Sequence, residues 1–170
     1  MTTEFRFEHV FRVPSTTAML EAYFDPDHLA AQDVLAELGG RTVIESTDEP
    51  AIRRCTWRVG ALKPLPFFAR PLVPGGKLQY LETMTWRRAD DEIDLVIKPE
   101  ILGGRVQIAA VYQLAQIGEG QVRRRYAGTI TVDVRLVAGK IERGVLAEIE
   151  KGMPIMTKCT QDWLDRARPA

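Results

Sequence analysis

The sequence has 170 residues, the length of one ordinary domain, and 45% of them are hydrophobic, as in a folded globular protein. The formal net charge is zero, so the chain lacks the surplus of lysine and arginine that binding to nucleic-acid phosphates requires. No apolar run is long enough to span a membrane, and residues 1–7 hold no stretch typical of a signal peptide. We therefore expect one domain over residues 1–170 that acts in the cytoplasm, without integral membrane association and without nucleic acid as a partner.

Residues 4–13 alternate between apolar and mostly charged side chains, which predicts a half-buried strand. His9 and Phe11 fall on the apolar face of this strand. His9 is therefore either a core histidine that bonds to its neighbours or a polar group directed into an apolar pocket. The second histidine of the chain, His28, is expected to be exposed.

Two short helices should follow this strand. Ser15 is a suitable N-cap for the first helix, and Asp25 with Pro26 suits the start of the second. The second helix should end at the glycine pair Gly39-Gly40. We expect these helices at residues 16–24 and 25–38.

The middle of the chain predicts six strands, because runs of alternating apolar residues are separated by short turns rich in Gly, Pro and Asp. The expected strands are residues 41–47, 51–60, 78–88, 92–99, 105–115 and 121–136. Short connections favour antiparallel neighbours. Residues 61–77 form an apolar, proline-rich loop of unusual length, which is a candidate gate, a docking patch or plain packing.

The C-terminal residues 140–166 predict one long amphipathic helix. Apolar side chains recur at intervals close to three and four, which places them on one face: Ile141, Val145, Ile149, Met153, Met156 and Trp163. Gly152 and Pro154 lie inside this helix, and we expect a kink there because proline removes a backbone donor. The methionines on the apolar face are equally suited to a lid over a ligand and to ordinary core packing.

Three segments carry a resemblance to a known superfamily. Residues 7–15 (FEHVFRVPS) are a strand that leads into a helix start, and residues 24–29 (FDPDHL) resemble a junction between two small helices. Residues 128–142 (GTITVDVRLVAGKIE) lead from the last strand into the long helix. With the order of elements, these segments resemble the START-like (SRPBCC) superfamily, which includes the birch pollen allergen, polyketide cyclases and aromatases, and steroid-transfer domains. The chain is most similar in character to a bacterial branch with no assigned function.

The resemblance implies an α+β helix-grip fold. In this fold a curved, seven-stranded antiparallel sheet and two short helices surround a long C-terminal helix. The resemblance also implies a cavity between the sheet and that helix, in which members bind, carry or cyclise lipids, sterols and polyketides. The superfamily has no shared catalytic motif, so no catalytic residue is transferred to this chain.

Glu82 is a polar residue on an otherwise apolar strand face, where an isolated buried charge would be very costly. Arg124 shares the apolar face of the last strand. We therefore expect a Glu82–Arg124 pair inside the sheet, which is either an internal salt bridge or the polar end of a ligand site.

Aromatic and methionine side chains complete the candidate site, although core packing is the alternative interpretation for each. We expect ligand contacts from His9, Phe11, Trp57, Tyr80, Glu82, Trp86, Tyr112, Arg124, Met153 and Met156. The chain shows no metal-ligand spacing, phosphate-binding loop or nucleophile motif, so we expect neither a metal nor a cofactor. Cys55 and Cys159 are expected to be reduced, partly buried thiols.

Three functions follow from these observations. The leading hypothesis is the binding or transport of a hydrophobic small molecule without catalysis. The second is an enzyme of the cyclase or aromatase kind, in which His9, Glu82 or a tyrosine acts as acid or base. The third is a protein-interaction module that uses the loop at residues 61–77 as a docking patch.

Overall fold

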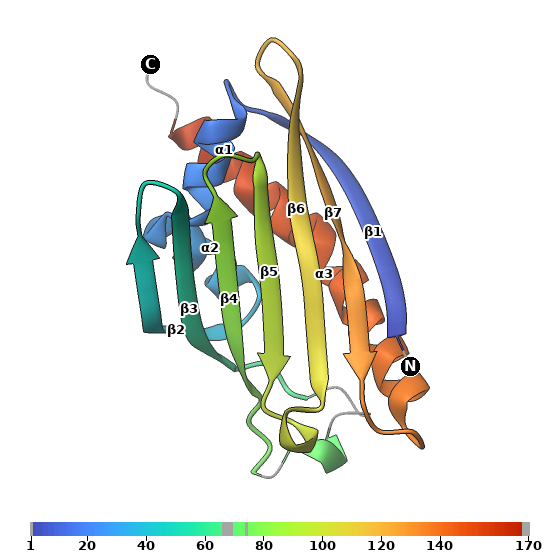
Figure 1. Cartoon of the computed structure of the whole chain (residues 1–170). Coiled ribbons are helices and arrows are strands. Elements are labelled where there is room, and N and C mark those ends of the chain that lie inside the picture. Colours follow the sequence, from blue (N-terminus) through green and yellow to red (C-terminus); the bar gives the residue numbers. More distant parts are fainter. Residues whose placement is uncertain (1, 66–69, 74, 168–170) are drawn as a thin grey trace.

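The computed structural model of the chain describes residues 2–65, 70–73 and 75–167 (Figure 1). The strands are β1 (Thr2–Arg12), β2 (Leu38–Asp48), β3 (Ile52–Ala61), β4 (Gln79–Arg87), β5 (Glu92–Pro99), β6 (Val106–Gly118) and β7 (Gln121–Val132). The helices are α1 (Thr16–Tyr23), α2 (Pro26–Leu35) and α3 (Ala138–Arg166), with short 3-10 turns at Arg70–Leu72 and Leu102–Gly104.

Over the described residues, the seven strands form one antiparallel sheet in the order β1-β7-β6-β5-β4-β3-β2. Each strand from β2 to β6 is paired with the next strand along the chain, as their short connections predict. Strand β1 pairs along its whole length with β7, so β1 and β2 are the two edges. All three helices cover one face of this sheet (Figure 1). The α+β helix-grip fold and the predicted order of elements are therefore confirmed.

Helix α2 is shorter than the sequence predicts. It ends at Leu35 with Ala36 as its C-cap, and β2 already begins at Leu38. The reversal takes place at Glu37, which has a positive φ of 55° and donates its backbone N–H to the carbonyl of Val34. A non-glycine residue thus adopts the left-handed conformation that we expected of the glycine pair, so the predicted end of this helix was wrong.

Helix α3 is one continuous element of 29 residues that lies against β1 and β7. It starts earlier than predicted, because β7 ends at Val132 and a turn at Val134 leads directly into the helix. Pro154 lies inside α3 and is exposed, and the helix continues through it without a break. The face toward the sheet carries the predicted apolar residues.

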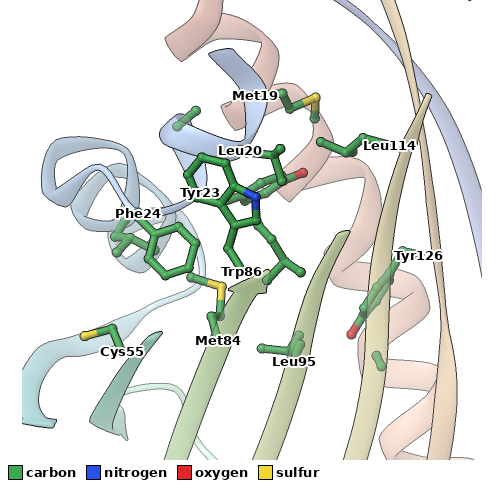
Figure 2. Close-up of a cluster of buried hydrophobic side chains, with 14 of the residues drawn as sticks. Met19, Leu20, Tyr23, Phe24, Cys55, Met84, Trp86, Leu95, Leu114 and Tyr126 are labelled. Carbon is green, nitrogen blue, oxygen red and sulfur yellow. The ribbon is translucent and has the colours of Figure 1, made fainter. Parts of the chain in front are cut away.

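The core has two parts in the described structure. The larger lies between the sheet and the helices, and Figure 2 shows Met84, Leu95 and Tyr126 on the face of the sheet that Tyr23 approaches from α1. The smaller includes Leu65 and Val73 of the long loop, which pack with Ile101, Val106, Val132, Ala138 and Ile141. These two loop residues therefore act as ordinary packing, whereas the predicted loop residues at 66–69 and 74 lie outside the described residues.

No helix within residues 2–65, 70–73 and 75–167 is both long enough and apolar enough to cross a membrane.

Candidate ligand-binding site

A cavity of about 230 Å³ lies between the sheet and the helices α2 and α3. Its apolar wall includes Leu29, Met84, Leu95, Ile97, Ile149 and Met156. Its polar groups come from two separate strands of the sheet, with Glu82 on β4 and Arg124 on β7. A concave site with apolar walls and few polar groups is the usual form of a small-molecule site.

Local periodicity explains why these side chains meet. In β4, Tyr80, Glu82 and Met84 alternate with outward-facing residues, so all three point to the helices. In α2, Leu29, Asp33 and Ala36 are spaced by four and three and therefore share the face that lines the cavity. The same spacing on α3 brings Ile149, Met153 and Met156 to the opposite wall.

Arg41 of β2 connects the two carboxylates of the cavity. Its Nε donates to both carboxylate oxygens of Asp33 at 3.0 Å, and its Nη1 donates to Oε1 of Glu82 at 2.6 Å. The guanidinium lies over the ring of Trp57, 5.5 Å from its centre. Arg41 thus reaches across β3 to β4, and the predicted Glu82–Arg124 pair was wrong because Arg41 holds Glu82 instead.

Burial and charge act in opposite directions in this cluster. Burial raises the pKa of Asp33, and the neighbouring Arg41 offsets only part of that rise. For Arg41, burial alone would lower the pKa, but Glu82 and Asp33 together raise it above its ordinary value. Arg41 is therefore always charged, and both carboxylates face the same cation.

Arg124 of β7 is only 2% exposed. Its Nη1 donates to the Tyr23 hydroxyl at 2.8 Å, and its Nη2 contacts Thr157 Oγ1 at 3.1 Å, His9 Nδ1 at 3.3 Å and Met153 Sδ at 3.5 Å. The guanidinium also lies over the rings of Phe11 and Tyr112, at 4.9 and 5.4 Å. Arg124 thereby joins β7 to α1, α3 and β1 through neutral groups.

Three tyrosines lie beside Arg124 and line the cavity. The rings of Tyr23 and Tyr112 stack at 4.9 Å, and those of Tyr112 and Tyr126 are 4.7 Å apart. Burial raises the pKa of each phenol, and the charge of Arg124 offsets this only in part. These hydroxyls are therefore neutral hydrogen-bonding groups at neutral pH.

Six of the ten predicted ligand contacts line this cavity: Tyr80, Glu82, Tyr112, Arg124, Met153 and Met156. The structure places the other four elsewhere. His9 and Phe11 border a separate shallow groove beside α3, and burial, followed by the charge of Arg124, lowers the pKa of His9. Trp57 lies beneath Arg41, and Trp86 packs between Phe24 and Arg88.

His28 is fully buried, so the expectation that it is exposed was wrong. Its Nδ1 lies 2.8 Å from the carbonyl oxygen of Ala22, and its Nε2 lies 3.1 Å from the Thr160 hydroxyl. Because a carbonyl only accepts, Nδ1 carries the hydrogen and Nε2 accepts from Thr160. His28 therefore fastens the two short helices to α3.

The predicted contacts do not include five cavity-lining residues on which the site depends: Tyr23, Asp33, Arg41, Tyr126 and Gly152. The helical spacing of Asp33 with Leu29 and Ala36 is a signal that places this carboxylate on a buried face. Nothing in the local sequence marks Arg41 of the largely exposed edge strand β2 as a residue that faces the cavity. Its role follows from the pairing of β2 with β3 and of β3 with β4.

Within the described part of the chain, no three His, Cys, Asp or Glu side chains gather into a group that could hold a metal ion. Cys55 and Cys159 are buried free thiols, and burial raises the pKa of both. Neither cysteine lines the cavity.

The helix-grip fold, with its cavity beneath the C-terminal helix, is that of the START-like superfamily. The chain belongs to the family described as "Protein of unknown function (DUF2505)", whose family model matches residues 7–164. A comparison with curated proteins found no match.

Solved structures with the same fold cover almost the whole chain. The Zhui aromatase/cyclase from Streptomyces sp. R1128 has a TM-score of 0.69 at 11% identity, over 100% of this chain and 98% of that one. A START superfamily protein from Mycobacterium smegmatis has a TM-score of 0.58 at 7% identity, over 97% and 99%. Norcoclaurine synthase from Thalictrum flavum, in complex with dopamine and hydroxybenzaldehyde, has a TM-score of 0.59 at 13% identity, over 100% and 90%. At these identities the likeness establishes the fold alone.

Proposed function

We propose that this protein binds or carries a small hydrophobic molecule in the cavity between the sheet and α3. The observation that carries the proposal is a cavity of about 230 Å³ whose wall is built mainly from aliphatic, methionine and tyrosine side chains. Burial of ligand surface against such a wall contributes about 25 cal/mol per Å² before the costs of binding. Met153 and Met156 on α3 provide an adaptable wall for ligands of different shape.

Binding without catalysis fits the acid and base groups of the cavity better than the cyclase or aromatase alternative does. Glu82 is held by Arg41, and burial raises the pKa of Tyr80, Tyr112 and Tyr126. His9 borders a different groove. A general acid or base works best with a pKa near the working pH, whereas burial moves the pKa of these three phenols further above neutrality.

Two further observations support a cytoplasmic location and a single domain. Both cysteines are buried free thiols, which suits a reducing compartment such as the cytoplasm. Helix α3 packs on β1, so the last element of the chain is held against the first. We therefore include in the proposal a single domain that acts in the cytoplasm.

The proposal is tested with the neutral apolar dye N-phenyl-1-naphthylamine. Gly152 lines the cavity, and a Cβ built on it meets nothing within 4 Å, so a Gly152→Leu side chain has room to occupy the ligand space. We expect saturable dye binding to the wild type and a loss of about tenfold or more in affinity for Gly152→Leu, equal to at least ~1.4 kcal/mol. Lys151→Leu, at the neighbouring exposed position, adds the same side chain outside the cavity and should bind like the wild type.

Two results would contradict the proposal. The first is the absence of saturable binding to the wild type, together with no small molecule recovered by native mass spectrometry after incubation with a lipid extract. The second is equal dye affinity for Gly152→Leu and Lys151→Leu, which would place the dye outside the cavity.

A further inference from the structure

Arg124 is a buried cation without an anion beside it. In the described structure, no carboxylate lies within ion-pair distance of its guanidinium, and every hydrogen-bond partner is a neutral oxygen, nitrogen or sulfur atom. His9, one of these partners, has a lowered pKa and does not add a charge. The Nε hydrogen is buried and has no partner.

Arg41 of the same cavity shows how unusual this arrangement is. Its guanidinium is comparably enclosed, yet two carboxylates lie against it at 3.0 and 2.6 Å. A buried charge is normally paired, because moving it out of water costs several kcal/mol that only an opposite charge and further hydrogen bonds offset. Arg41 has opposite charges beside it, whereas Arg124 has none in the described structure.

Arg124, which lacks a counter-charge, is part of the candidate ligand site. Arg124 lines the cavity together with Tyr112 and Tyr126, whose phenols are kept neutral by burial. A neutral phenol donates its O–H to an anionic oxygen. Asp33 and Glu82 lie at the α2 side of the same cavity, where they would repel a negative group.

We propose that the ligand is a small apolar carboxylate whose anionic oxygens bind Arg124 and the hydroxyls of Tyr112 and Tyr126. The inference rests on the proposed function and names the chemical class of its ligand. The carboxylate supplies the negative charge that the guanidinium of Arg124 lacks, and the apolar body of the molecule lies between the sheet and the methionines of α3. The acidic groups held by Arg41 exclude the reverse orientation.

The first test needs no variant and compares 2-naphthoate with 2-naphthamide, which share one apolar body and differ in charge. Isothermal titration calorimetry at pH 7.5 should give a dissociation constant for the carboxylate that is about tenfold or more below that of the amide, as for a charge-assisted hydrogen bond. Because the site is buried, this preference should persist when the salt concentration is raised from low to physiological values.

The second test assigns the preference to Arg124. We expect Arg124→Met to bind both compounds equally, and Arg124→Lys, which keeps the charge, to retain a preference for the carboxylate. Arg125→Met is the matched control, because Arg125 is the next residue of β7, lies on the opposite face and pairs with Glu8. It removes the same net charge and should leave the preference unchanged.

The outcomes separate this inference from the proposed function. If both compounds bind the wild type with equal affinity, the cavity takes apolar ligands but the carboxylate inference is wrong. If neither compound nor the neutral dye binds, both are wrong. If Arg125→Met abolishes the preference as fully as Arg124→Met does, the effect belongs to the net charge of the protein and the assignment to Arg124 is overturned. If Arg124→Met does not fold, the affinities of the wild type and of Arg124→Lys for 2-naphthoate and 2-naphthamide still test the carboxylate inference.

Discussion

Arg41 lies between Asp33 and Glu82, and both of these carboxylates are largely removed from solvent. In the described structure it is the only cation within ion-pair distance of either one. A buried ion pair adds little net stability by itself, because the desolvation of its charges cancels most of their attraction. Removal of one member has a large effect, however, because the remaining charges stay buried without a partner.

We therefore predict that Arg41→Met lowers the free energy of unfolding by about 3–5 kcal/mol, measured by urea denaturation at pH 7.5. Arg53→Met, which breaks an exposed pair with Glu21, should cost less than about 1 kcal/mol. Adding Asp33→Asn and Glu82→Gln to Arg41→Met should restore much of the lost unfolding free energy, because the two buried carboxylate charges are then removed as well. Equal losses for the two single variants would show that Asp33 and Glu82 do not depend on Arg41.

At the scale of elements, a short chain of hydrogen bonds fastens α1 and α2 to α3. His28 donates to the carbonyl of Ala22 and accepts from Thr160, and Gln32 donates to the same Thr160 hydroxyl at 3.2 Å. The arrangement requires a neutral imidazole, and burial accordingly lowers the pKa of His28 below its ordinary value of 6.5. The packing of the helices is therefore linked to pH.

The sign of this linkage follows from the lowered pKa. The unfolded chain takes up a proton on His28 near pH 6.5 while the folded chain does not, so this stability is present above that pH and lost as the pH falls below it. We predict that the unfolding free energy of the wild type declines from pH 7.5 to pH 5.5. His28→Asn should be less stable than the wild type by about 1–3 kcal/mol at pH 7.5, because it loses the hydrogen bonds of the imidazole. Its unfolding free energy should, however, fall less than that of the wild type between pH 7.5 and pH 5.5.

His9→Asn is the matched control for this experiment. The pKa of His9 is also lowered, first by burial and then by Arg124, but His9 is more exposed than His28. It should therefore keep most of the wild-type slope. If His28→Asn and the wild type lose the same free energy over this range, His28 is not the group that links helix packing to pH.

For the molecule as a whole, the sequence predicted the features that depend on residues close together in the chain. Alternation of apolar residues and short turns predicted the seven strands and the antiparallel pairing of consecutive strands from β2 to β7, because both act between near neighbours. The partner of Glu82 was predicted incorrectly, because it depends on the register of β2, β3 and β4 and on the reach of Arg41. The burial of His28 depends on Thr160, which is 132 residues away in the sequence. Long-range packing, which a single sequence does not encode in its spacing, accounts for both errors.

Strands β6 and β7 approach each other closely at Gly128. Gly128 of β7 pairs with Ala110 of β6, and a Cβ built on Gly128 would lie 2.3 Å from the carbonyl oxygen of Ala109 and 2.6 Å from the Cβ of Ala110. The nearer of these atoms belongs to the backbone, so no side-chain rotation relieves the contact. Glycine in a strand often marks a position where another backbone comes close.

Gly128→Ala should therefore destabilise the protein by about 3 kcal/mol, because β6 and β7 must move apart to admit the methyl group. Gly152→Ala makes the same chemical change in α3, where the added Cβ meets nothing within 4 Å, and should stabilise it by roughly 0.5–1 kcal/mol through helix propensity. Urea denaturation measures both effects, and dye titration measures their consequence for the cavity. Separation of β6 from β7 displaces Tyr112 and Tyr126, so Gly128→Ala should also weaken dye binding, whereas Gly152→Ala should preserve it. If Gly128→Ala proved as stable as the wild type, β6 and β7 would have room between them for a methyl group, and the close approach at Gly128 would not constrain the sheet.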